Sequence, residues 1–141
     1  MPGQTGAASD PYITSVQWSR RFIGLKLFMA LAEQGEAGYV EMIERQAHMG
    51  DVLRDALTGA GWRIVNRTPL PLVCFTRDGL VASTFLAALY ERQIAWMSEV
   101  RLGDAAPVVR ACITSFRTQQ SDIEWVVREM SRIEREAEVI A

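Results

Sequence analysis

Arg110 is the residue of this sequence whose type and position most directly suggest chemistry. It stands in the middle of the apolar run "VVRACI", where an arginine needs an anionic partner because burying an unpaired charge is costly. Its planar guanidinium suits one carboxylate, which it can bind through two parallel hydrogen bonds. The alternative is an arginine on a solvated strand face, or one paired within the domain.

The other chemically capable side chains are few. His48 is the single histidine and falls within a predicted helix, and there is no CxxC pair, so a zinc site is not expected. Cys74 and Cys112 each lie in an apolar run, which favours buried free thiols over a disulfide and indicates a cytoplasmic location. Lys26 is the only lysine.

Length, charge and hydropathy set further limits. The 141 residues suit one domain. The formal net charge of -2 does not indicate binding to a nucleic acid or an anionic membrane. No apolar run reaches the roughly 18 residues that a membrane span needs. We therefore expect neither nucleic acid nor membrane as a partner.

The pattern of apolar residues predicts helices at both ends of the chain. One helix is expected from near residue 16 to Gly35 and a second directly after it, ending at "GAG" (59–61). Residues 81–92 predict a third helix. A fourth, at 121–135, has capping-box spacing between Ser121 and Glu124, and the charged tail after it is expected to fray into solvent.

Four short segments between these helices alternate or are rich in β-forming residues. They predict strands near 62–66, 71–76, 95–101 and 108–114. Short strands close in sequence favour antiparallel pairing. The apolar stripe of each predicted helix must be buried against another element, and the sheet provides that surface. The predicted fold is therefore α+β: two N-terminal helices, then a four-stranded, mainly antiparallel sheet with helices on one face.

The first predicted helix is unusual because it has almost no polar face. Between residues 22 and 32 its only charged residue is Lys26. A surface helix normally shows one apolar stripe, so we expect other protein surfaces to cover this one. The sequence thus predicts a flexible leader (1–11), an interface helix (12–35) and a small domain (36–141), with a homodimer formed through residues 16–34.

Three stretches resemble the C-terminal part of the pyridoxal-phosphate-dependent group II decarboxylases, which include the aromatic-L-amino-acid and glutamate decarboxylases. They are "SRRFIGLKLF" (19–28), "GYVEMIERQAHMGDVLRDAL" (38–57) and "VVRACITSFRTQQSDIEWVVREM" (108–130). The resemblance covers roughly residues 12–135. It implies the small C-terminal domain of the aspartate-aminotransferase-like fold, with the first helix wedged between the large domain, the small domain and the dimer partner.

The resemblance also assigns roles to residues. Trp18, Ser19 and Arg20 would lie near the phosphate of pyridoxal phosphate, although Ser19 stands where the family commonly has glycine. Arg110 would bind the substrate carboxylate or organise the domain junction. The Schiff-base lysine belongs to the large domain, and Lys26 matches a helix lysine instead.

Taken alone, the chain is accordingly expected to be inactive and to bind no cofactor covalently. It would be one part of a carboxy-lyase that acts on an amino acid, and its partner would be a lysine-bearing large domain from the same gene or a separate chain. The alternative is a stand-alone, non-catalytic α+β dimerisation or binding module.

Overall fold

The computed structural model describes residues 23–140, with side chains up to residue 136. They fall into two units that meet between Tyr39 and Val40. The first helical element, α2 (Ile23–Gly59), crosses this boundary and is interrupted at Gly35, whose φ of 65° and ψ of 176° are non-helical. Glycine adopts this backbone conformation without a Cβ penalty. The helix break predicted at Gly35 is therefore confirmed, whereas the predicted start near residue 16 lies outside the described residues.

Four strands form one antiparallel sheet in the unit that follows residue 39. They are β1 (Arg63–Ile64), β2 (Leu72–Thr76), β3 (Ser98–Val100) and β4 (Val108–Cys112). The strand order is β1-β2-β4-β3, so β2 and β4 are central and the two shortest strands form the edges. Every pair is antiparallel. The predicted sheet is confirmed, with each strand inside its predicted range.

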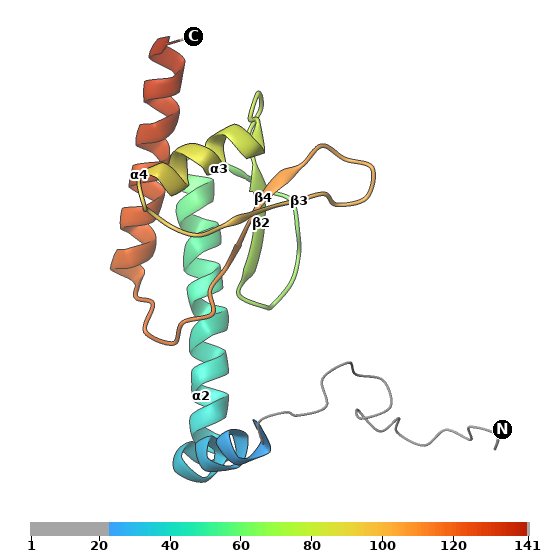
Figure 1. Cartoon of the computed structure of the whole chain (residues 1–141), viewed down its shortest axis with the longest axis vertical. Coiled ribbons are helices and arrows are strands. Elements are labelled where there is room, and N and C mark those ends of the chain that lie inside the picture. Colours follow the sequence, from blue (N-terminus) through green and yellow to red (C-terminus); the bar gives the residue numbers. More distant parts are fainter. Residues whose placement is uncertain (1–22, 141) are drawn as a thin grey trace, which may run out of the picture. The chain divides into compact units, whose positions relative to one another are not determined.

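One face of the sheet carries the core. Val73 and Phe75 of β2 pair with Ala111 and Val109 of β4, and all four side chains are buried. They join one apolar cluster with residues of α3 (Ala82–Glu91), α4 (Gln120–Ile140) and the part of α2 that follows residue 39, which lie beside the sheet in Figure 1. The α+β fold with helices on one face of the sheet is confirmed. Fully buried members of this cluster are Leu57, Val73, Phe75, Leu89, Val109 and Met130.

The structure corrects both expectations about α4. The helix begins at Gln120, and the carboxylate of Asp122 accepts a hydrogen bond from the Gln119 N–H at 2.9 Å. The capping box predicted from Ser121 and Glu124 is wrong because the helix starts one residue before Ser121. The tail does not fray either: α4 continues to Ile140, since Ile133 is buried and Glu136 pairs with Arg92 of the C-terminal end of α3 at 2.5 Å.

Side chains of α2 fix the connections that lead into and out of the central strands. Arg54 donates to the backbone carbonyls of Thr68, Leu70 and Leu72 before and within β2, at 2.9, 2.8 and 3.3 Å. Arg45 donates to carbonyls in the connection after β4 at 3.3 and 3.0 Å, and Gln46 does so at 2.9 Å. Apart from the Leu72 carbonyl, which belongs to β2, these bonds satisfy carbonyls of the loops next to β2 and β4, so α2 holds both connections in place.

Candidate functional site

The face of the sheet opposite the core brings Arg110 next to two other polar side chains. Paired residues of antiparallel strands point to the same face. The register pairs Arg110 with Cys74 on one side and with Ser98 on the other, so the three residues form a row across β2, β4 and β3. We name this surface the Arg110 face and define it by Arg63, Leu72, Cys74, Thr76, Ser98, Val100, Val108, Arg110 and Cys112.

Arg110 is half-buried at the centre of this face. Its Nε–H donates a hydrogen bond to the Ser98 hydroxyl, with 3.0 Å between Nε and Oγ. Within residues 23–136, no carboxylate lies in ion-pair range of the guanidinium. The structure therefore leaves the charge of Arg110 without an anionic partner from the described part of this chain.

The two cysteines differ in their surroundings. Both are free thiols, Cys74 buried and Cys112 exposed, so the prediction of free thiols is correct for both and the prediction of burial holds for Cys74 alone. Burial raises the pKa of the Cys74 thiol, and the nearby positive charge of Arg110 lowers it by less. Cys74 is thus held neutral beside Arg110 and cannot serve as its counter-ion.

The predicted cofactor residues Trp18, Ser19 and Arg20 lie outside the described residues. Lys26 is exposed on the helical stretch before Gly35, and His48 is exposed on α2 after it. No group of three or more metal-ligating side chains occurs among the described residues, and no helix in that same part of the chain is long and apolar enough to cross a membrane. Of the predicted site residues, the structure places only Arg110.

Ser98 is a site residue that the sequence analysis missed. A serine in a short strand carries no mark of function, and its pairing with Arg110 depends on the register of β3 on β4. The one sequence feature that could have pointed to Ser98 is the alternation of side chains along a strand. Ser98 and Val100 lie two residues apart and therefore share a face of the sheet.

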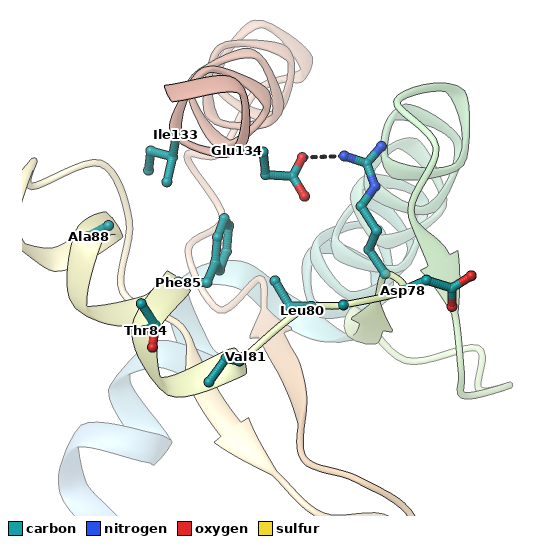
Figure 2. A pocket seen from close by; sticks show the side chains of 10 residues that line it. Asp78, Leu80, Val81, Thr84, Phe85, Ala88, Ile133 and Glu134 are labelled. Carbon is teal, nitrogen blue, oxygen red and sulfur yellow. Dashed lines mark hydrogen bonds and ion pairs between the residues drawn. The ribbon is translucent and has the colours of Figure 1, made fainter. Parts of the chain in front are cut away.

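A separate cavity of about 310 Å³ lies between the turn after β2, helix α3 and helix α4. Figure 2 shows the apolar side chains of Leu80, Phe85 and Ile133 on its walls, together with Glu134. Arg77 also lines the cavity and forms an ion pair with Glu134. Its lining contains no lysine, histidine or cysteine. The charge of Arg77 at this cavity is paired with Glu134, whereas Arg110 has no anionic partner among residues 23–136, so the Arg110 face is the better candidate for binding an anion.

Comparisons with known proteins agree with this fold. No protein-family model matches the chain, and no curated protein matches it by sequence. Among solved structures, Oryza sativa TDC with PLP and tryptamine superimposes with a TM-score of 0.71 and 21% identity, covering 92% of this chain and 30% of that one. Catharanthus roseus tryptophan decarboxylase in complex with L-tryptophan superimposes with a TM-score of 0.71 and 19% identity, and the match covers 84% of this chain and 28% of that one. Mouse CSAD superimposes with a TM-score of 0.72 and 17% identity, and the match covers 94% of this chain and 32% of that one.

These structures are group II pyridoxal-phosphate decarboxylases, and the chain shares their aspartate-aminotransferase-like fold over most of its length. The resemblance predicted from the sequence is confirmed at the level of the fold. The chain spans about three tenths of the length of the proteins that it matches.

The Arg110 face alone does not fit the reactive part of pyridoxal phosphate. That cofactor needs an amine to hold it and an acid beside its pyridine nitrogen. The residues of the Arg110 face include neither a lysine nor a carboxylate. They do include one arginine, Arg110, whose planar guanidinium suits a carboxylate.

Proposed function

We propose that this chain is the C-terminal domain of a pyridoxal-phosphate-dependent amino-acid decarboxylase, or one part of a split enzyme of that kind. The observation that carries the proposal is the shared fold: three decarboxylase-type structures cover 84–94% of this chain while the chain covers 28–32% of them. The remaining part of the enzyme would be a large domain that supplies the Schiff-base lysine. Pyridoxal phosphate would supply the electron sink for loss of carbon dioxide.

In this proposal the chain closes the active site and does not catalyse the reaction alone. Lys26 is the only lysine in the sequence, and it is exposed on a helix whose other side chains are largely apolar. A lysine that forms a Schiff base is usually activated by desolvation or by a neighbouring cation. The exposure of Lys26 argues against the first of these, so the catalytic amine must come from the partner domain.

The proposed anion-binding groups divide between two places. Trp18, Ser19 and Arg20 would contact the cofactor phosphate, for which backbone N–H groups at a helix start and an arginine are well suited. Arg110 would bind a carboxylate, either that of the substrate or an acidic side chain at the domain junction. The absence of an anionic partner for Arg110 within residues 23–136 supports this role.

The chain would also contribute to a homodimer through residues 16–34. In the described part of this range, six large apolar side chains are between 46% and 68% exposed: Ile23, Leu25, Leu27, Phe28, Met29 and Leu31. An apolar surface of this kind usually marks an interface. The free thiols suit a reducing compartment, so we place the complete enzyme in the cytoplasm.

The test is reconstitution. The 141-residue chain would be produced alone and together with any lysine-bearing large domain that is encoded directly upstream, and both samples would be supplied with pyridoxal phosphate and amino acids. Co-purification of the two parts and release of carbon dioxide by the mixture alone are the expected results. A chain that forms a stable, folded species, binds no such domain and gives no activity with it would instead be a stand-alone module.

A further inference from the structure

The hydrogen bond between Arg110 and Ser98 determines which edge of the guanidinium remains available. An arginine carries one N–H on Nε and four on Nη1 and Nη2. The Nε–H is directed to the Ser98 hydroxyl at 3.0 Å. Nη1 and Nη2 have no hydrogen bond or ion pair with any side chain of residues 23–136.

Nothing else on the Arg110 face competes for those four N–H groups. Cys74, directly opposite Arg110 on β2, is buried, and its thiol is neutral because burial raises its pKa. Arg63 and Cys112 are the other ionisable groups of the face, and both are exposed. Arg63 is a cation and cannot pair with Arg110, and neither Arg63 nor Cys112 forms a hydrogen bond or ion pair with it in the described residues.

We propose that Ser98 is a positioning residue that fixes the Arg110 guanidinium so that Nη1 and Nη2 together bind one carboxylate of the amino-acid substrate. Binding at this edge places both carboxylate oxygens in line with the side chain, whereas binding at the Nε edge would displace Ser98. The inference deepens the proposed function and rests on it, because the substrate is an amino acid only if the chain is part of such a decarboxylase.

The positioning role is tested on the 141-residue chain by nuclear magnetic resonance of the Arg110 Nε–H group. Ser98→Thr keeps the hydroxyl, and Ser98→Val has nearly the same shape without it. We expect a protected Arg110 Nε–H signal in the unmodified chain and in S98T, and its loss by solvent exchange in S98V. Ser98→Ala provides the same comparison if S98V does not fold. An unchanged signal in the folded variant that lacks the hydroxyl would overturn the positioning role.

A second experiment tests whether the carboxylate that Arg110 binds is that of the substrate. It measures the effects of the Ser98 variants on KM and on kcat separately in the reconstituted enzyme. Because a hydrogen bond to a charged group is lost, S98V should raise KM for the amino acid about tenfold, with kcat changed less than about twofold, and S98T should restore KM. An unchanged KM in S98V, with weaker association of the two parts, would show that Arg110 pairs with an acidic residue at the junction and would overturn the substrate assignment.

These two measurements also separate this inference from the proposed function. If the reconstituted protein releases no carbon dioxide from any amino acid, the proposed function fails and the substrate assignment fails with it. The comparison of S98T with S98V then still decides whether Ser98 positions Arg110.

Discussion

Arg77 and Glu134 form an ion pair that joins the C-terminal end of β2 to the middle of α4, with 2.5 Å between Nη1 and Oε2. The same guanidinium donates from Nη2 to the Ala60 carbonyl at 2.7 Å and lies 5.2 Å from the centre of the Trp62 ring. The Glu134 side chain is only 12% exposed. One arginine side chain thus connects α4 to β2 and to the end of α2.

Replacing Arg77 should destabilise the fold. Arg77→Met keeps most of the aliphatic stem but removes the charge opposite the nearly buried Glu134 and the hydrogen bond to Ala60. We expect the free energy of unfolding to fall by about 2 kcal/mol, measured by urea denaturation. Arg132→Met is the matched control: its pairs with Glu129 and Glu136 are more exposed, so the loss should stay below about 0.5 kcal/mol. Equal losses in both variants would contradict this account.

Gly50 should tolerate no side chain, because α2 passes close to the chain before β2 at this residue. A Cβ atom on Gly50 would lie 2.9 Å from the Cα of Pro71, and backbone cannot move aside as a side chain can. Gly50→Ala should therefore destabilise the fold by about 1–3 kcal/mol despite the better helix propensity of alanine. Gly59→Ala has nothing within 4 Å and should be neutral or stabilising. Thermal unfolding of both variants gives the comparison.

The isolated chain should self-associate through the apolar helix before Gly35. Covering its exposed side chains contributes about 25 cal/mol per Å² before the cost of association. We expect sedimentation to show a dimer at tens of micromolar, and Phe22→Ser combined with Phe28→Ser to yield monomers. Leu70→Ser, which replaces a residue 60% exposed in the other unit, should leave the dimer intact. A monomeric unmodified chain would refute the prediction.

The two thiols should react at very different rates. At pH 8 a disulfide reagent should label Cys112 rapidly and Cys74 only when the chain unfolds, because Cys74 is buried and its pKa is raised above its usual value of 9.0.

The raised pKa of Cys74 also links stability to pH, because it means that the folded state holds the thiol proton more tightly than the unfolded state does. This contribution to stability is complete below the unfolded pKa and is lost as the pH rises through the folded pKa. Peptide mapping after labelling checks the order, and Cys112→Ser should abolish the rapid phase.

Lys26 should form no Schiff base with the cofactor. When the isolated chain is mixed with pyridoxal phosphate and reduced with borohydride, we expect no stoichiometric labelling of Lys26, because an exposed amine on a helix lacks the activation of a catalytic lysine. Peptide mapping by mass spectrometry is the measurement. Complete, specific labelling of Lys26 at equimolar cofactor would contradict both this prediction and the proposed dependence on a partner domain.

Local signals were sufficient to predict most of the fold. Gly35 breaks the first helix because its backbone angles suit glycine, and such a residue can be recognised without tertiary information. The strands were found because alternation and turn residues delimit short segments. The start of α4 was missed because Gln119 and Asp122 offered a competing cap, and the choice between two caps depends on how the helix packs against α2 and α3.

The site was less accessible to sequence reasoning. Arg110 could be singled out because a lone charge in an apolar run needs an explanation wherever it occurs. Ser98 could not, since its role arises only when β3 pairs with β4 in one register. The carbonyl contacts of Arg45 and Arg54 were missed for the same reason: surface arginines on a helix show no sign in the sequence of which distant loop they will reach.

The strand order has a consequence for how the chain folds. The central pair, β2 and β4, joins residues 72–75 with 109–112, so α3 and β3 both lie in the loop that this pairing closes. Loop closure costs entropy before the non-local contacts compensate for it, which slows folding. During synthesis, β2 must remain without its central neighbour until β4 has left the ribosome. In that interval the apolar run "LVCF" is exposed with unpaired backbone groups, and intermolecular strand pairing is the main risk to the nascent chain.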